Sequence, residues 1–238
     1  MSNKQYTIVE MFNQIAPTYD RANRVLSFGV DTVWRKKACN KSFALLGEKK
    51  VNLIVDVACG TGDMMEYWRR QAKAKGIEVG RIVGIDPSEG MVNVGRQKFP
   101  HFDFEIAYAT QLPLADASAD IVSISYGIRN VLARQEAFGE FNRVLKMGGL
   151  VVILEFTRQA RPSIMGRVTS FYLNRVLPKI GGFISRNKAA YEYLPNSIEG
   201  FVTTETMRDE LIAAGFEPLY IRSFSMNIST LFIVKKVR

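Results

Sequence analysis

An acidic, glycine-containing segment carries the clearest chemical signal in this chain of 238 residues. The segment Asp56–Asp63 (DVACGTGD) closes the apolar run 51–57. Gly60 and Gly62 allow the backbone to approach a ligand more closely than a side chain would permit. A dinucleotide fingerprint would need a further glycine where Met65 stands, so NAD is disfavoured. The two acids instead suit the ammonium and sulfonium charges of S-adenosyl-L-methionine, and an ordinary glycine-rich turn is the alternative.

A third acid, Asp86, stands where a nucleoside would need one. Asp86 ends the apolar run 81–86 and can accept hydrogen bonds from both ribose hydroxyls; a helix-capping role is the alternative, and both can hold together. Met91 is predicted to pack on the adenine, and the backbone of Tyr108 and Ala109 to lie along its edge. The reacting methyl group is expected near residues 125–130, where the next strand ends.

These segments lie at the ends of strands in an alternating strand and helix pattern. Short apolar runs typical of buried parallel strands cover residues 51–57, 81–86, 104–107, 119–125 and 150–155. Helices are predicted over 63–76, from near Pro87, over 134–146 and over 204–214. The strand-like runs 217–224 and 229–236 can pair antiparallel. The pattern predicts an α/β fold with a doubly wound, mostly parallel seven-stranded sheet and a C-terminal antiparallel hairpin, the Rossmann-like shape of class I methyltransferases.

The chain is predicted to form a single methyltransferase domain. Its segments are an N-terminal helical cap (1–47, with a polar interruption at 16–20), a cofactor-binding core (48–156), a helical lid insertion (157–202) and a C-terminal helix and hairpin (203–238). No metal site or disulfide framework is predicted, because Cys39 and Cys59 lack the required spacing and His101 is the single histidine. The start of the chain has no leader-like pattern and no apolar run is long enough to span a membrane, which predicts a cytoplasmic protein.

The net charge of +9 would suit a nucleic acid, an anionic lipid surface or an anionic ligand. Nucleic acid is disfavoured, because the turn after Ser125 lacks the paired prolines of amino-methyltransferases and no cysteine follows Cys59 to attack a cytosine. Residues 163–188 mix apolar and basic side chains. They predict a lid that rests on anionic lipid at the inner face of the cytoplasmic membrane and admits a polyprenyl chain. A self-packed cap or a homodimer contact is the alternative.

Five further segments can be compared with the motifs of a known enzyme family. Residues 19–35 (YDRANRVLSFGVDTVWR) are similar to Y-D-x-x-N-x-x-x-S-x-G-x-H-x-x-W, with Asp31 at the histidine. Residues 124–131 (ISYGIRNV) are similar to I-S-F-G-L-R-N-V. Residues 143–149 (RVLKMGG) and 154–156 (LEF) match R-V-L-K-P-G-G and L-E-F except at Met147, and 191–198 (YEYLPNSI) is similar to Y-x-Y-L-x-x-S-I. From Val9 onward, the chain resembles the menaquinone and ubiquinone biosynthesis C-methyltransferase family.

The resemblance implies an S-adenosyl-L-methionine-dependent enzyme that methylates a ring carbon of a polyprenyl quinol, with demethylmenaquinol as the first choice. The family's cofactor contacts, carried over onto this sequence, fall on Thr61, Asp86, Tyr108 with Ala109, and Ser125, with Gly60 and Gly62 shaping the pocket. Tyr108 departs from the family's usual Asp or Asn, so adenine recognition there is expected to use backbone groups.

Residues at two places in the chain, 19–20 and 129–130, are predicted to act on the acceptor. Arg129 is expected to stabilise a phenolate or to activate a water, with a loop-holding salt bridge as the alternative. Asn130 is expected to orient the quinol oxygen, and Tyr19 or Asp20 to complete the pocket, with helix packing as the alternative for Tyr19. The other functions considered are a benzoquinol methyltransferase of the ubiquinone pathway, methylation of another naphthoquinone position, a non-catalytic cofactor-binding subunit, and an RNA methyltransferase supported by charge alone.

Overall fold

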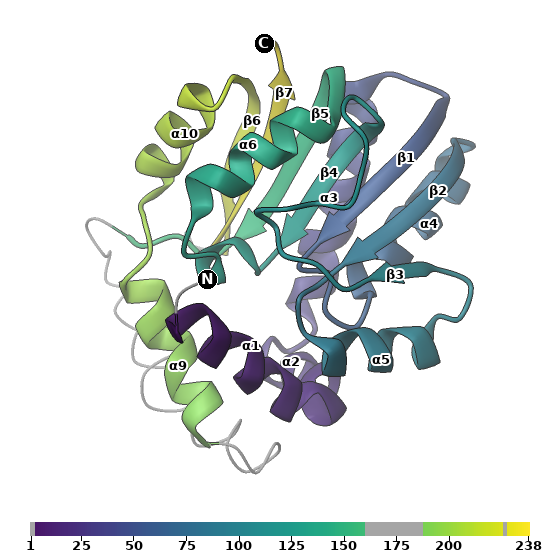
Figure 1. Ribbon diagram of the computed structural model, residues 1–238. Helices are drawn as coiled ribbons and strands as arrows, with labels where there is room; N and C mark the ends of the chain where they lie inside the picture. The colour runs from purple at the N-terminus through teal and green to yellow at the C-terminus, as the bar shows by residue number, and fades with distance from the viewer. Residues whose placement is uncertain (1–2, 160–187, 226–227) are drawn as a thin grey trace.

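A seven-stranded sheet forms the centre of the computed structural model, which describes residues 3–159, 188–225 and 228–238 (Figure 1). The strands are β1 (Lys50–Val57), β2 (Glu78–Ile85), β3 (Asp103–Glu105), β4 (Ala119–Ser125), β5 (Leu145–Glu155), β6 (Phe216–Phe224) and β7 (Ser229–Lys236). They lie in the order β3-β2-β1-β4-β5-β7-β6. β1 to β5 pair in parallel, whereas β7 pairs antiparallel with β5 and β6. The predicted doubly wound sheet with its C-terminal hairpin is confirmed.

Helices cover both faces of the sheet, which explains why the central strands carry apolar side chains on both faces. On one face lie α3 (Val30–Leu46), α4 (Asp63–Lys75) and α5 (Glu89–Lys98), in a core that includes Trp34 and Trp68. On the other face lie α6 (Arg134–Val144) and α10 (Thr204–Ala213), in a core that includes Phe138 and Leu211. The two cores hold the strands in place, so the strand ends form a fixed edge.

Further helical elements lie across the edge where the parallel strands end, at the bottom of Figure 1. They are α1 (Asn3–Ile15), the 3₁₀ turn η1 (Ala16–Thr18), α2 (Tyr19–Leu26) and α9 (Lys188–Glu199). The predicted interruption near residues 16–20 is η1, which has Pro17 at its start. Within the described ranges, no helix combines the length and apolar character that crossing a bilayer requires.

Some element boundaries differ from the predictions. α6 ends at Val144 rather than at 146, because Leu145 already pairs with Ala119 and starts β5 ahead of its glycines. The short edge strand β3 covers residues 103–105 rather than 104–107. α5 begins after Pro87, since the Ser88 hydroxyl accepts a hydrogen bond from the backbone N–H of Met91 and caps the helix. Most of the predicted lid, residues 160–187, lies outside the described residues.

Candidate active site

A cavity of about 560 Å³ opens at the carboxyl edge of the sheet. Its wall comes from α1 and from the segments that follow β1, β2, β3 and β4. The predicted site residues that line it are Tyr19, Gly60, Asp86, Met91, Tyr108, Ala109, Ser125 and Asn130. Ligands of open parallel sheets bind at this edge, and the volume is that of a site for a nucleoside-sized molecule.

Asp86 joins the loops that follow β1 and β2. Its Oδ2 accepts a hydrogen bond from the Gly60 N–H at 2.9 Å, and its Oδ1 accepts one from the Ser88 N–H at 2.8 Å. The residue is 8% exposed, and its burial raises the pKa of Asp86 to about 6, although the two backbone hydrogen bonds act to lower it. Each carboxylate oxygen keeps accepting capacity. The ionised group can therefore still accept hydrogen bonds from ribose hydroxyls.

The loops after β1 and β4 pack tightly against each other. Ala58 and Tyr126 have φ values of 50° and 60°, a left-handed conformation that costs a residue with a side chain about 1 kcal/mol. A Cβ atom at Gly127 would lie 2.5 Å from the Cβ of Ala58, so only glycine fits there. Backbone strain of this kind persists where the surrounding structure fixes it, and it is frequent at ligand sites.

Ser125 presents an unpaired hydroxyl in this region. It lines the cavity, and its Oγ is buried without a hydrogen-bond partner. Buried hydroxyls in native proteins nearly always have a partner. An unpaired hydroxyl in a cavity wall therefore indicates a position where a ligand supplies the missing hydrogen bond.

Helix α1 covers the cavity and is anchored at both ends. The Gln5 side chain donates to the carbonyl oxygen of Asn130 at 3.1 Å and accepts from the Leu132 N–H at 3.1 Å. Asn13 Oδ1 accepts from the Ser88 hydroxyl at 2.7 Å and from the Gly90 N–H at 3.0 Å. The apolar residues that α1 turns toward the cavity are Ile8, Val9 and Phe12. The sequence analysis predicted the helix but missed both anchors, since polar contacts across more than 70 residues leave no local pattern.

A second, smaller cavity of about 30 Å³ adjoins the first. The two share the wall residues Tyr19, Ala58, Gly60 and Ser125. The rest of the smaller cavity is mainly polar, and its charged residues are Asp20, Arg24, Asp31, Arg35, Asp56 and Asp63. We call it the polar cavity.

Asp56, which was predicted at the cofactor, lines the polar cavity rather than the larger one. Its Oδ1 accepts a hydrogen bond from the Ser123 hydroxyl at 2.6 Å, and Ser123 accepts one from the Trp68 indole N–H at 2.9 Å. Burial raises the pKa of Asp56 to about 7, against the lowering effects of Ser123 and of the Arg35 guanidinium. Near neutral pH the carboxyl group is therefore close to half ionised, and a nearby cation would complete its ionisation.

Arg35 is a candidate that the sequence analysis did not select. Its Nε is buried without a hydrogen-bond partner, and the nearest carboxylate oxygen in an ion pair with it is Asp31 Oδ2, at 3.6 Å. The guanidinium carbon lies 5.4 Å from the centre of the Tyr126 ring. Its position directly after Trp34, at the end of the N-terminal signature, was the one available signal.

Thr61 and Asp63 hold α2 against the core. The Thr61 hydroxyl donates to Asp20 Oδ1 at 2.5 Å, and Lys98 Nζ lies 2.5 Å from oxygens of both Asp20 and Asp63. Arg24 is 3.4 Å from Asp63. Burial acts to raise the pKa of Asp63, but the surrounding cations lower it below its ordinary value. Asp63 is thus already paired by the protein's own cations, and neither residue lines the larger cavity.

Gly62 and His101 lie outside both cavities. A Cβ atom at Gly62 would approach the Phe104 ring to 2.9 Å, so this glycine serves packing against that ring rather than a ligand. His101 is half exposed and lies 3.9 Å from Glu66, away from the carboxyl edge of β4.

Arg129 forms an ion pair behind the wall of the larger cavity. Its Nη1 donates to Glu155 Oε1 and to the Tyr126 carbonyl oxygen, both at 2.7 Å, and its Nε donates to the Ser197 hydroxyl at 3.2 Å. The two charged side chains are 7% and 0% exposed. Arg129 lines neither cavity, and Glu155 neutralises its charge. The observed contacts are those of the loop-holding salt bridge that the sequence left as the alternative.

Asn130 and Tyr19 do line the larger cavity. Asn130 Oδ1 accepts a hydrogen bond from the Tyr193 hydroxyl at 3.0 Å, which leaves the amide nitrogen as the group for a ligand. Burial raises the pKa of Tyr19, and Arg35 lowers it by less. Its hydroxyl therefore stays protonated at neutral pH and can donate a hydrogen bond.

Together these features fit the nucleoside portion of S-adenosyl-L-methionine. Asp86 suits the ribose, Met91 and the apolar side chains of α1 suit the adenine, and the unpaired Ser125 hydroxyl lies at the end of β4, where the reacting group is expected. The strained loops after β1 and β4 bring these groups to one cavity.

Comparison with known proteins decides the family. The model of the ubiE/COQ5 methyltransferase family matches residues 1–236. This chain belongs to that family. The ubiquinone/menaquinone biosynthesis C-methyltransferase UbiE of Campylobacter jejuni is 55% identical over 234 residues, which is 98% of this chain and 99% of that protein. The demethylmenaquinone methyltransferase of Chlorobaculum parvum is 36% identical over 97% of this chain and 92% of that protein.

A solved structure extends the likeness to the fold. A methyltransferase from Thermotoga maritima aligns with a TM-score of 0.59 and 22% identity, covering 95% of this chain and 98% of that one. As a member of the ubiE/COQ5 family, the chain is an S-adenosyl-L-methionine-dependent C-methyltransferase. The predicted family, activity and cofactor are thereby confirmed, whereas the role of each site residue stays a prediction.

Proposed function

We propose that this enzyme methylates a ring carbon of a polyprenyl quinol, with demethylmenaquinol as its acceptor. The observation that carries the proposal is the full-length similarity to relatives named for ubiquinone/menaquinone biosynthesis and for demethylmenaquinone. The ubiquinone-pathway benzoquinol is the second candidate acceptor, because the name of the 55% identical relative includes both quinones.

The chemistry requires an electron-rich ring carbon. A quinone carbon is a poor nucleophile, whereas a quinol hydroxyl donates electron density to the ring, more so when it is deprotonated. S-adenosyl-L-methionine supplies an electrophilic methyl group when bound. The chain's own task is to hold the ring carbon roughly 3 Å from that methyl group and in line with the breaking bond. The apolar side chains of α1 that line the cavity would also exclude water, which strengthens attraction between a phenolate and a cation.

In this proposal Tyr19 and Asn130 contact the acceptor. The protonated Tyr19 hydroxyl and the Asn130 amide nitrogen are both donors in the cavity wall, suited to a quinol oxygen that gains negative charge. Arg129 is a positioning residue: its bonds to the Tyr126 carbonyl and to Glu155 hold the loop that carries Asn130. Its positive charge acts on the acceptor only weakly, since Glu155 neutralises it.

The direct test is incubation of the purified enzyme with labelled S-adenosyl-L-methionine and a panel of chemically reduced quinones, followed by mass analysis. We expect a product heavier by one methyl group from reduced demethylmenaquinone and none from the oxidised form. Exclusive methylation of the benzoquinol would favour the ubiquinone-pathway alternative. Nucleoside binding without methylation of any quinol in the panel would contradict the proposed acceptor class.

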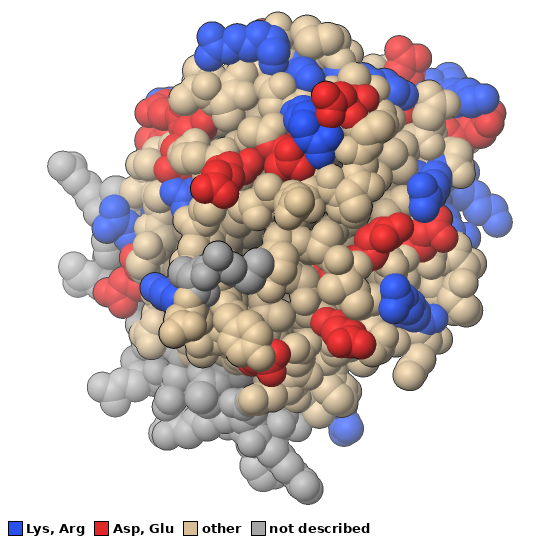
Figure 2. Space-filling model, in the orientation of Figure 1, with Lys and Arg blue, Asp and Glu red and all other residues tan. Residues whose placement is uncertain are grey.

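An RNA acceptor remains the weakest alternative. On the face shown in Figure 2, Lys and Arg side chains are interspersed with Asp and Glu side chains rather than gathered in one track. Binding to RNA depends on a basic surface and weakens steeply with salt. A filter-binding titration at two salt concentrations therefore tests this alternative in the same preparation.

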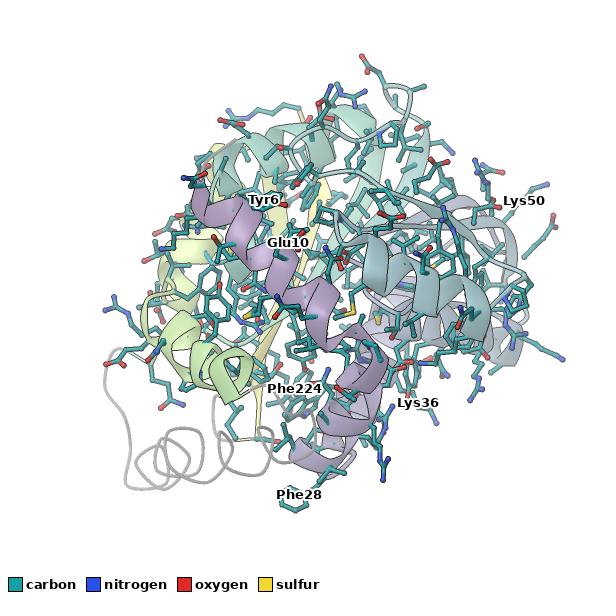
Figure 3. All side chains as sticks on the ribbon, turned by 60° about the horizontal axis from the view of Figure 1, so that its bottom comes forward. Tyr6, Glu10, Phe28, Lys36, Lys50 and Phe224 are labelled. Carbon is teal, nitrogen blue, oxygen red and sulfur yellow. The ribbon has the colours of Figure 1, made fainter. Side chains whose placement is uncertain are left out.

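A polyprenyl acceptor would be met at a membrane, and we propose that the end of α2 and the start of α3 contact an anionic bilayer. We call this surface the α2–α3 tip; its exposed residues are Arg21, Arg24, Val25, Phe28, Val30, Val33, Lys36 and Lys37. Phe28 is 79% exposed and points away from the body of the protein (Figure 3). The single acid within residues 21–37, Asp31, is paired with Arg24. Exposed apolar groups among cations suit an anionic lipid surface.

Co-sedimentation with anionic and with neutral vesicles at low salt tests this contact. We expect binding to the anionic vesicles, weakened by Val33→Asp. Ile212→Asp is the matched control, because Ile212 is similarly exposed but lies on α10. Equal binding of the two variants would contradict the assigned surface, and dimers formed without lipid would favour the homodimer alternative.

A further inference from the structure

Helix α9 carries the segment 191–198, whose likeness to the family motif the proposed function leaves unexplained. This helix packs against α1 and against the 3₁₀ turn η2 (Ile128–Asn130), which follows β4 (Figure 1). It therefore contacts both the helix that covers the larger cavity and the turn that carries two of the residues predicted to act on the acceptor. The side chains of α9 at this junction are candidates for a part in methyl transfer.

Two polar side chains of α9 hold η2. The Tyr193 hydroxyl donates to Asn130 Oδ1 at 3.0 Å, and the Ser197 hydroxyl accepts from Arg129 Nε at 3.2 Å. Ser197 donates its own proton to the carbonyl oxygen of Leu194 at 2.7 Å, which leaves its lone pairs for Arg129. The Leu194 side chain packs against an apolar cluster that includes residues of α1 and α2. These contacts fix α9 in place beside the turn.

The Tyr193 hydroxyl is suited to donate to Asn130. Burial raises the pKa of Tyr193, although the Arg129 guanidinium acts to lower it, so the hydroxyl keeps its proton at neutral pH. The same cation favours donation, because a positive charge close to a hydroxyl makes its proton more acidic. Donation to Oδ1 keeps the amide oxygen of Asn130 toward α9 and leaves the amide nitrogen for the cavity that Asn130 lines.

A half-turn of the Asn130 amide would exchange its oxygen and its nitrogen. The two atoms are nearly the same size, so their hydrogen-bond partners decide which one faces the cavity. An amide oxygen there would repel a quinol oxygen that gains negative charge during the reaction, whereas an amide nitrogen stabilises it. We infer that Tyr193 is a positioning residue for methyl transfer, which keeps the Asn130 nitrogen directed at the acceptor. This inference rests on the proposed function, since the acceptor oxygen is that of the quinol.

Single-turnover methylation of reduced demethylmenaquinone tests this role, because its rate does not include product release. Tyr193→Phe removes only the hydroxyl, and we expect it to lower the rate constant about 3- to 10-fold, the range for one neutral hydrogen bond. The quinol concentration that gives half the maximal rate should change by less than about twofold, because the donor acts mainly on charge that develops in the transition state. Tyr67→Phe is the matched control and should change neither value, since Tyr67 is also partly buried but lies on α4.

A second background separates positioning from a general effect on the fold. In Asn130→Ala the amide is absent, so adding Tyr193→Phe should change the rate constant by less than about twofold. An equal loss in both backgrounds, or no loss in either, would overturn the inference. Binding of S-adenosyl-L-homocysteine in calorimetry should be the same in Tyr193→Phe as in the wild type, because the hydroxyl acts on the acceptor.

Should Asn130→Ala be too slow to measure, the side-chain amide NMR signals of Asn130 decide. They are identified in ¹⁵N-labelled enzyme by their loss in Asn130→Asp. Reduced demethylmenaquinone added with S-adenosyl-L-homocysteine, which has no methyl group to transfer, should shift these signals in the wild type and shift them much less in Tyr193→Phe. Equal shifts in the two proteins, or none in the wild type, would overturn the inference. A wild-type enzyme that shows the shift but methylates no quinol would count against the proposed reaction alone.

Discussion

Replacing Asp56 by Asn tests how much the buried ionisable carboxyl group lowers the stability of this fold. The substitution keeps the size of the side chain and an oxygen that can accept from Ser123, but removes the ionisable group. Burial raises the pKa of Asp56 from 3.8 to about 7. A group whose pKa is raised by folding stabilises the protein below the unfolded value and loses that contribution as the pH rises through the folded value. The interval of about three pH units corresponds to about 4 kcal/mol.

We therefore expect Asp56→Asn to raise the free energy of unfolding by up to about 4 kcal/mol near pH 8, and by about 2 kcal/mol less near pH 5.5. Urea unfolding followed by fluorescence of the buried Trp34 and Trp68 measures both values. Asp103→Asn is the control, because Asp103 is exposed in a surface ion pair with Arg81 and should change stability by less than about 1 kcal/mol at either pH. A gain that is the same at both pH values would refute the reasoning.

Three further outcomes follow from the same geometry. Gly127→Ala should lower the free energy of unfolding by about 1–3 kcal/mol through overpacking. Gly139→Ala is the control: a Cβ atom there meets open space in α6, so this substitution should stabilise the helix by up to about 1 kcal/mol. Arg129→Ala should retain nucleoside binding in calorimetry and lose most methyl transfer, and full turnover in this variant would remove the residue from the mechanism. The variant should also lower the free energy of unfolding by about 3–5 kcal/mol, because Glu155 is left buried without its cation. Adding Glu155→Gln to the same chain should relieve that loss. Affinity for S-adenosyl-L-homocysteine should fall as the pH drops through about 6, because Asp86 takes up a proton there, and a pH-independent affinity would contradict its ribose contact.

The sheet and the position of the site could be predicted because both follow from local patterns. The apolar run at Val51–Val57 predicts a strand buried on both faces, and β1 is that strand. The carboxyl ends of such strands meet at one edge, so Asp86, Ala109 and Ser125 were expected together and do line one cavity. The boundary of α6 was wrong by two residues, since pairing of Leu145 with Ala119 overrides the signal of the glycines that follow.

The polar contacts between distant segments could not be predicted from the sequence. Nothing in the sequence near Arg35 shows that it lines one cavity with Asp56, because α3 and β1 are brought together by the core around Trp34 and Trp68. Glycine spacing alone likewise did not distinguish Gly60, which lines both cavities, from Gly62, which packs on Phe104. Such distinctions depend on tertiary packing, which a local motif does not encode.

The anchoring of α1 has a consequence for turnover. In the proposed site the spent nucleoside would lie under this helix, and lifting the helix to release it would exchange the bonds made by Gln5 and Asn13 for bonds to water. Each exchange costs about 1 kcal/mol, so the helix can lift often without global unfolding. We expect these two side chains to control the rate of product release, independently of the groups that carry out the methylation.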